Sequence, residues 1–230
     1  MTRLEQVESR IVSCARCPRL VSWREESAAH PPARYAGQAY WARPVPGFGD
    51  PAARVLVVGL APAAHGGNRT GRVFTGDRSG DFLFQVLYET GFANQPVSVE
   101  LGDGLRLADL YVAAVNRCAP PHNKPTVEER DNCLPFLVAE LRALDRVRVV
   151  VCLGAFAWDG ALRALARLGH SARPRPRFGH LAVMEMGPYT LIGSFHPSQQ
   201  NTFTGRLKPS MLRDVFVRAR SLGGLPPAAG

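Results

Sequence analysis

The chain has 230 residues with 46% hydrophobic side chains, enough for one large α/β domain or two small ones with a sizeable core. Its formal net charge of +9 indicates a polyanionic partner, most simply nucleic acid, although a basic solvated surface gives the same balance. The charged start MTRLEQVESR lacks the apolar core of a signal peptide, and no apolar run approaches the ~20 residues that span a bilayer. We therefore expect a cytoplasmic protein with no membrane partner.

The first quarter of the chain is expected to hold one helix, a long irregular segment and one strand. Residues 4–12 have helical spacing, with their apolar side chains on one face. The segment 23–50 is rich in proline, glycine and aromatic side chains, which predicts an irregular wrap over the core. Residues 54–59, RVLVVG, form a short β-branched apolar run that is typical of a buried strand.

Helices and strands then alternate toward the C-terminus. Thr126 is expected to cap a helix reaching about residue 144, because TVEE resembles a capping box with Glu129 at the third helical position. The nearly continuous apolar run VRVVVCL at 147–153 predicts a central strand. The remaining predictions are strands at 110–115, 181–186 and 190–195, helices at 79–88, 155–168 and 209–221, a polar loop at 199–205 and a disordered tail from about 223.

This alternation predicts an α/β fold with a mainly parallel sheet that is covered by helices on both faces. The sequence has no linker with a shift in composition and no internal repeat. We therefore expect a single domain spanning residues 1–230, acting as a monomer.

The longest predicted loop, residues 59–77, follows the first core strand and has the sequence GLAPAAHGGNRTGRVFTGD. Ligands bind at the carboxyl ends of strands in open α/β sheets, and loops of this length are either functional or disordered. The apolar ends of the loop argue against disorder. Its glycines allow backbone to approach a ligand closely, while Phe74 and Asp77 supply a flat face and a carboxylate. We predict that this loop forms part of a binding site.

Five cysteines in a chain expected to be cytoplasmic favour metal binding or reactive thiols over disulfides. Cys14 and Cys17 form a CxxC pair whose spacing suits two thiolates on one metal centre. With Cys118 and Cys133 they make four candidate ligands for zinc or for a [4Fe–4S] cluster. The wide second pair disfavours a zinc ribbon, but spacing alone leaves both metals open. Cys152 lies within an apolar strand and is expected to be a core thiol.

Four motifs, GLAPA, GRVFTGD, VNRCAPPHNKP and SFHPS, occur in this order, with cysteines before and between them. Together they resemble the iron–sulfur uracil-DNA glycosylases, most closely family 5 (type B), over nearly the whole chain. The resemblance implies a three-layer α/β/α fold around a four-stranded, mainly parallel sheet. It implies a structural [4Fe–4S] cluster on Cys14, Cys17, Cys118 and Cys133. It also implies excision of uracil from DNA, with a wider tolerance that includes hypoxanthine and other deaminated bases.

Two positions depart from the related family 4 enzymes. Those enzymes have GEAPG in the first loop, with a carboxylate where this chain has Leu60, and an asparagine where this chain has Ala114. The lack of a polar group at Leu60 is itself a mark of family 5. We therefore look for a water ligand elsewhere, and Asn116 stands two residues before Cys118 on the second strand's continuation.

A base inside a duplex must be flipped into a pocket before its glycosidic bond is attacked. Phe74 matches the family's stacking phenylalanine, the alternative being a core phenylalanine. Gly59, Ala61 and Ala63 are expected to wall the pocket with backbone and apolar surface. His196, at the carboxyl end of a strand, is the candidate donor that stabilises the departing base. The alternative for His196 is an ordinary histidine whose hydrogen bonds are satisfied by a loop.

The attacking water needs a ligand and a group that accepts its proton. Asn116 is expected to hold the water by hydrogen bonds, although an amide cannot act as a base. Asp77 is a candidate for the base or for stabilising the cationic sugar. The alternative for Asp77 is a helix N-cap ahead of the helix at 79–88.

Gln199, Gln200 and Asn201 follow the HPS motif directly, and we expect them to enter the minor groove and fill the gap left by the flipped base. The alternative is a plain solvated loop.

The chain has only two lysines, Lys124 and Lys208, and neither lies in an apolar, pocket-like context. We therefore predict a monofunctional enzyme that forms no Schiff base and leaves an abasic site.

Two other classes of protein stay open on the sequence. One is a nucleotide-binding or electron-transfer iron–sulfur protein, but GLAPAAHGG is not the GxGxxG of a dinucleotide site. The other is a non-catalytic iron–sulfur DNA-binding protein, which needs the basic charge but not His196.

Overall fold

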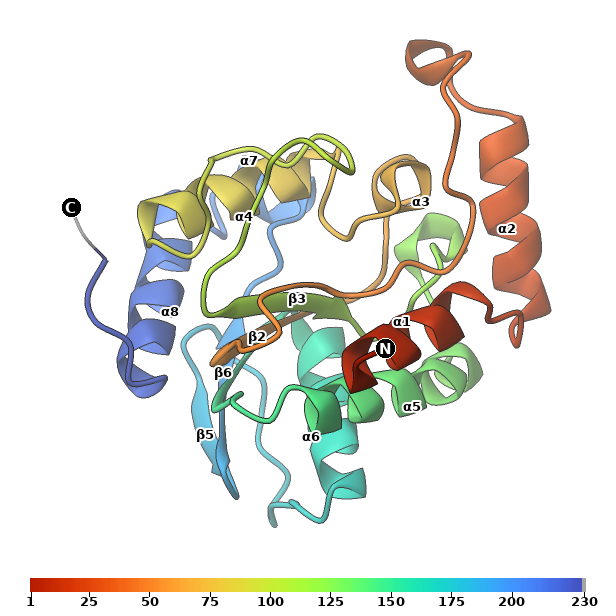
Figure 1. The fold of residues 1–230 in the computed structure, drawn as a ribbon. Helices are drawn as coiled ribbons and strands as arrows, with labels where there is room; N and C mark the ends of the chain where they lie inside the picture. The colour runs from red at the N-terminus through yellow and green to blue at the C-terminus, as the bar shows by residue number, and fades with distance from the viewer. Residues whose placement is uncertain (229–230) are drawn as a thin grey trace.

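The computed structural model describes residues 1–228, with a six-stranded sheet of strand order β1-β3-β2-β4-β6-β5 at its centre (Figure 1). The four inner strands are parallel to one another, and the two edge strands are antiparallel to their neighbours. The strands are β1 Phe48–Gly49, β2 Val55–Gly59, β3 Leu110–Ala114, β4 Val149–Leu153, β5 Val183–Met186 and β6 Tyr189–Ser194. The predicted four-stranded parallel sheet is confirmed as the inner part of this larger sheet.

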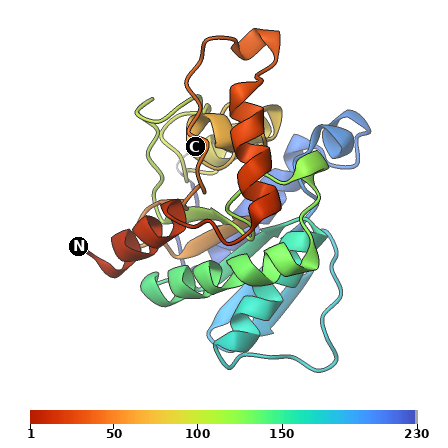
Figure 2. The ribbon, with the colours of Figure 1, turned by 90° about the vertical axis from the view of Figure 1, so that its right-hand side faces the viewer.

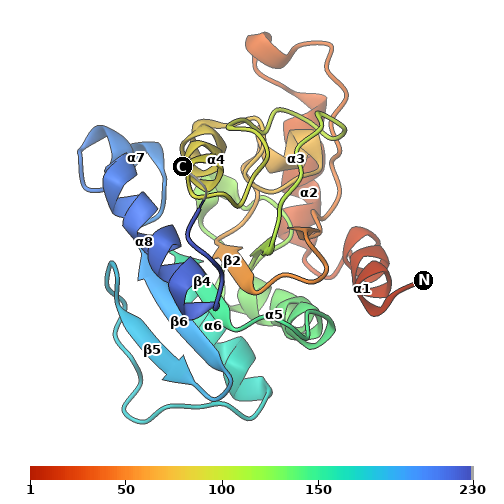
Figure 3. The same ribbon diagram turned by 60° about the vertical axis from the view of Figure 1, so that its left-hand side comes forward.

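Helices cover both faces of the sheet, so the predicted three-layer α/β/α fold is confirmed (Figure 3). Every side chain of β2 is buried, and alternate residues face opposite layers. Leu56 and Val58 pack in the core with α1, α5 and α6, whereas Val55 and Val57 pack with α4 and α8. These helices are α1 Arg3–Val12, α4 Arg78–Glu89, α5 Val127–Ala143, α6 Ala155–Arg167 and α8 Pro209–Leu222.

The predicted start of α5 is confirmed by its capping box. The backbone N–H of Glu129 donates to Oγ1 of Thr126 (3.2 Å), and the backbone N–H of Thr126 donates to Oε2 of Glu129 (2.7 Å). Two N–H groups that have no partner inside the helix are thereby satisfied, which fixes where α5 begins. Cys133 is carried on this helix.

The largest difference from the sequence prediction is α2 (Pro18–Ala29), since residues 23–50 were expected to be irregular. Pro18 occupies the first helical turn, where its fixed φ and missing N–H favour a helix start. Only Leu20, Arg24 and Ser27 are buried on α2, so no apolar stripe marks it in the sequence. The helix rises beyond the α1–α5 pair and is followed by the short 3-10 helix η1 (Ala33–Tyr35) (Figure 2).

Three further segments differ from, or add to, the prediction. The short helix α3 (Gly67–Thr70) lies inside the loop at 59–77, and α7 (Gln199–Phe203) replaces part of the polar loop at 199–205. Residues 223–228, expected to be disordered, pack beside α8, where the carbonyl of Pro226 accepts from Nε of Arg220 (2.8 Å). Residues 229–230 lie outside the described residues. No helix among residues 1–228 is long and apolar enough to cross a membrane.

Candidate active site

A cavity of about 590 Å³ opens at the carboxyl edge of the parallel strands, where the sequence predicted a binding site. The loop after β2, the 3-10 helix η2 (Pro121–Asn123) and the segment after β6 surround it. Of the predicted site residues, it brings together Ala61, Ala63, Phe74, Asp77, His196, Gln199 and Gln200. Segments far apart in the sequence therefore form one site, which we call the base cavity.

Phe74 lies in the wall of the base cavity in a conformation that is rare for a bulky residue. Its φ is +52°, and only 8% of its surface is exposed. Its ring packs on Gly59, the last residue of β2, where an added Cβ would lie 2.7 Å from the ring carbons. Gly59 was predicted to wall the pocket, but the structure places it beneath Phe74, outside the lining. The small residue lets the aromatic ring approach the strand.

His196 also lines the cavity, as the second residue after β6. The centroid of its ring is 5.8 Å from that of Phe74, at an interplanar angle of 34°. Burial lowers the pKa of His196 to about 4, so the imidazole is neutral at physiological pH. A neutral imidazole carries one N–H donor, which suits it to bind a developing negative charge on a flat ligand.

Asp77 is the N-cap of α4 and also lines the base cavity. Its Oδ1 accepts from the backbone N–H of Gly80 (3.0 Å), which makes it the N-cap of α4. Its Oδ2 lies over Gly66, where a Cβ would come within 2.2 Å, and the residue lines the base cavity. Burial raises the pKa of Asp77, and the bonds from backbone N–H groups only partly oppose this shift. A carboxylate with a raised pKa is well suited to accept a proton near neutral pH.

Asn116 is fully buried and does not line the base cavity. Its backbone N–H donates to the carbonyl of Leu60 (3.0 Å), which joins the continuation of β3 to the loop after β2. Neither Oδ1 nor Nδ2 of its side chain has a hydrogen-bond partner in the described chain. Buried amides are seldom unpaired, so this one marks a place for a water or a polar group of a ligand.

The three polar residues after the HPS motif do not act alike. Gln199 and Gln200 are exposed on α7 and line the base cavity, as a DNA contact requires. The side chain of Asn201 instead turns inward, and its Nδ2 donates to the carbonyl of His196 (2.8 Å). Asn201 therefore helps to fix the segment that carries His196, and the groove contact expected of it stays a prediction.

The sequence reasoning missed η2, whose residues His122 and Asn123 line the base cavity with positive φ values of 55° and 56°. The only signal for it was the proline-flanked, polar composition of APPHNKP. Lys124 follows η2 and also lines the cavity, although it is exposed at the rim. The prediction that Lys124 does not lie in a buried, apolar context agrees with this exposure.

Cys14, Cys17, Cys118 and Cys133 line one small cavity of about 10 Å³. Two of the sulfurs accept hydrogen bonds from buried donors: Cys118 from Nη1 of Arg24 (3.3 Å) and Cys133 from the backbone N–H of Arg117 (3.4 Å). Burial raises the pKa of Cys118 to about 11 and that of Cys133 to about 12. Cys152 is fully buried in β4, as predicted for a core thiol.

Arg24 also connects the cysteine cavity with the loop that carries Phe74. Its guanidinium reaches the sulfur of Cys118, while its backbone carbonyl accepts from Nδ2 of Asn68 (3.1 Å). Asn68 belongs to α3 within the loop at 59–77 and is 1% exposed. The cysteine cavity thereby helps to hold one wall of the base cavity.

Comparisons with known proteins match most of the chain to one superfamily. The family model described as "Uracil DNA glycosylase superfamily" matches residues 46–219. A protein of Mycobacterium bovis named type-5 uracil-DNA glycosylase is 53% identical over 96% of this chain and 82% of its own length. The type-5 uracil-DNA glycosylase of Thermus thermophilus is 50% identical over 94% of this chain and 96% of its own length. A type-4 uracil-DNA glycosylase of Archaeoglobus fulgidus is 37% identical over about half of each chain, 49% and 49%.

Proposed function

Since the chain belongs to the uracil-DNA glycosylase superfamily, we propose that it is a uracil-DNA glycosylase similar to the type-5 enzymes. It binds uracil flipped out of DNA, hydrolyses the N-glycosidic bond and leaves an abasic site for repair. The observation that carries the proposal is the base cavity, in which Phe74, His196 and Asp77 meet at the carboxyl edge of the sheet.

Two residues act on the base itself in this proposal. The ring of Phe74 stacks on the flipped base. An aromatic face can stack on any base, because every base has a flat π-face. His196 donates its single N–H to the base oxygen on which negative charge develops as the bond breaks. A neutral donor suits this task because a buried cation at His196 is disfavoured by its low pKa, about 4.

Asp77 and Asn116 act on the water. Asp77 accepts the proton of the attacking water, or stabilises the cationic sugar, from its place beside the cavity. Its raised pKa supports the first role, since an effective base has a pKa close to the working pH. The unpartnered amide of Asn116 supports a role in holding the water or the base, once DNA closes the site.

The wall at residues 60–64 supports a broad choice of bases. It presents Leu60, Ala61 and Ala63 to the cavity, with no polar side chain to select one exocyclic group. A wall that lacks such groups contributes little to the rejection of related bases. We therefore include hypoxanthine and other deaminated bases among the substrates.

A [4Fe–4S] cluster on Cys14, Cys17, Cys118 and Cys133 is the second part of the proposal. Its support is that all four thiols line one cavity. N–H···S bonds from Arg24 and Arg117 would stabilise the thiolates that hold the cluster. The cluster would supply structure, tying α1, α2 and α5 together beside the base cavity.

A simple assay tests the proposed function. The protein is incubated with a single-stranded oligonucleotide that contains one deoxyuridine, and the product is analysed before and after alkali. We expect strand breaks only after alkali, because a monofunctional enzyme leaves the sugar–phosphate chain intact. Borohydride trapping of an adduct that Lys124→Ala abolishes would show that this rim lysine forms a Schiff base, against the proposal. Tight binding without breaks would indicate the non-catalytic DNA-binding protein instead.

A further inference from the structure

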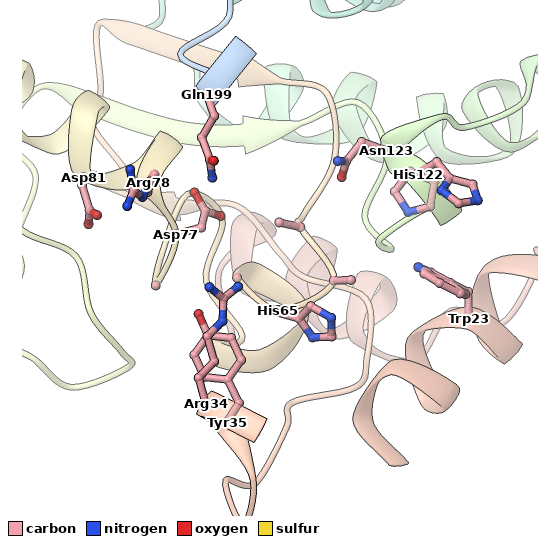
Figure 4. Close-up of a pocket in the computed structure, with 15 residues that line it drawn as sticks. Trp23, Arg34, Tyr35, His65, Asp77, Arg78, Asp81, His122, Asn123 and Gln199 are labelled. Carbon is pink, nitrogen blue, oxygen red and sulfur yellow. The ribbon is translucent and has the colours of Figure 1, made fainter. Parts of the chain in front are cut away.

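A second cavity, of about 400 Å³, opens beside the base cavity and holds side chains that the proposed chemistry does not use. The two cavities share Ala63, Asp77, Arg78, His122, Asn123 and Gln199, so they form one continuous groove. The outer wall of the second cavity comes from α2 and η1, through Trp23, Arg34 and Tyr35 (Figure 4). The segment that the sequence failed to predict as a helix therefore extends the site.

Trp23 contributes a flat apolar face and an unused hydrogen-bond donor. Its Nε1 is buried and has no partner among residues 1–228. In Figure 4 the indole nitrogen is directed toward the groove, and the ring lies beside that of His122, with centroids 6.4 Å apart. Because buried N–H groups are almost always paired, the unpaired one indicates that a polar group of a ligand or a water binds here.

Arg34 contributes an exposed cation that stacks on an aromatic ring. Its guanidinium lies over the ring of Tyr35, 4.8 Å from the centroid, and Arg69 lies 4.3 Å from the same centroid. Arg69 is itself fixed, since its Nε donates to the carbonyl of His65 (2.9 Å) and its Nη2 to the carbonyl of Gly76 (3.2 Å). Arg34 is exposed, and no carboxylate within residues 1–228 forms an ion pair with it. A guanidinium held in this way is ready to bind a phosphate.

We propose that this second cavity binds the nucleotide next to the uracil on the same DNA strand, with its base unstacked against Trp23 and its phosphate at Arg34. The inference rests on the proposed function, which places the uracil in the adjoining cavity. An aromatic face combined with a cation is the usual site for unpaired nucleic acid, because every base has a face to stack and every nucleotide a phosphate. A neighbour that stays stacked in a duplex cannot reach Trp23, so the site favours single-stranded DNA.

The test compares two single-stranded oligonucleotides that carry one deoxyuridine. The first has ordinary neighbours, and in the second both neighbours are tetrahydrofuran residues, which keep the phosphates but lack bases. We measure kcat/KM for uracil release and, in parallel, Kd by fluorescence anisotropy. The variants are Trp23→Ala, Trp23→Phe and Arg34→Ala. The control is Arg146→Ala. It removes an exposed arginine that lies before β4, at the amino ends of the parallel strands and away from the cavities.

We expect Trp23→Ala to weaken binding and lower kcat/KM on the first oligonucleotide by roughly 10-fold, the usual effect of losing one stacked base. On the second oligonucleotide, where nothing is left to stack, it should have no effect. Trp23→Phe should keep most of the wild-type affinity and kcat/KM, because phenylalanine can also stack on a base. Arg34→Ala should weaken both oligonucleotides about equally, because both keep the phosphate, and Arg146→Ala should change neither.

Equal losses for Trp23→Ala on both oligonucleotides, or no loss on either, would overturn the inference. Failure of the proposed function looks different, because the wild-type protein would then release uracil from neither oligonucleotide. The anisotropy measurement would still show in that case whether Trp23 contacts a base beside the uracil.

Discussion

At the scale of single residues, the base cavity depends on backbone conformations that neighbours make possible. The positive φ of Phe74 is costly for a bulky side chain, and such strain is commonly found at functional sites. The ring stays in place because Gly59 leaves room beneath it. Asp77 and His196 are likewise held at ends of elements, as the N-cap of α4 and as the second residue after β6.

Gly59→Ala tests this arrangement directly. The new Cβ would lie 2.7 Å from the ring carbons of Phe74, so the ring must move toward the space intended for the base. We expect uracil release to fall by roughly 10-fold or more, the effect of losing one stacking contact. The matched control is Gly179→Ala, where the added Cβ meets Ala182 at an ordinary 3.5 Å. Unchanged activity in Gly59→Ala, measured on protein with a native circular dichroism spectrum, would exclude a stacking role for Phe74.

The candidate residues differ in how far the sequence could place them. Phe74, Asp77 and His196 were predictable because each belongs to a motif that follows a strand, and strand ends meet at one edge. The inward side chain of Asn201 was not predictable. In a polar segment the same residue could face solvent or, as here, donate to the carbonyl of His196. The burial of Asn116 was also hidden, since it depends on how the loop after β2 covers the end of β3.

At the scale of elements, α2 links the two sites. Its residue Arg24 bonds both the sulfur of Cys118 and, through Asn68, the loop of the base cavity, and Trp23 beside it faces the groove. The sequence could not predict α2 because its buried face is not apolar. Arg24 is buried against the cysteine cavity, a position that hydrophobic periodicity does not reveal.

The proposed cluster makes a prediction that metal analysis tests. We expect iron and acid-labile sulfide in equal amounts, about four of each per chain. Cys133→Ser should lose most of the iron and lower the thermal midpoint, because the thiolates then no longer tie α5 to α1 and α2. Cys152→Ala is the control, since this thiol lies in β4 away from the cavity and its loss should leave the iron content unchanged. One zinc ion per chain and no sulfide would contradict the proposal.

At the scale of the whole molecule, the sequence was sufficient for the architecture. The apolar strands, the capping box at Thr126 and the alternation of strands with helices are local signals, and all are confirmed. The antiparallel edge strand β1 (Phe48–Gly49) was missed, because two residues that pair with β3 leave no pattern of their own. The groove between the base cavity and α2 was missed for a different reason: its residues come from distant segments and meet only in the folded chain.

In the proposed mechanism Asp77, in its ionised form, activates the water in the base cavity. Because burial raises the pKa of Asp77 in the folded protein, its ionisation destabilises the fold as pH rises through that pKa. Asp77→Asn removes this cost and keeps an equally good N-cap for α4, so the variant should be at least as stable as the wild type at pH 7.5. A loss of activity in this variant would therefore report on chemistry and not on unfolding.

The most direct test is the pH dependence of single-turnover uracil release by the wild type and by Asp77→Asn. We expect the wild-type rate to fall as the pH drops through the raised pKa of Asp77. Asp77→Asn should be slower by roughly 100-fold or more, without the decline on the acid side that the wild type shows. An unchanged rate in Asp77→Asn, or the same decline in both proteins, would contradict the account.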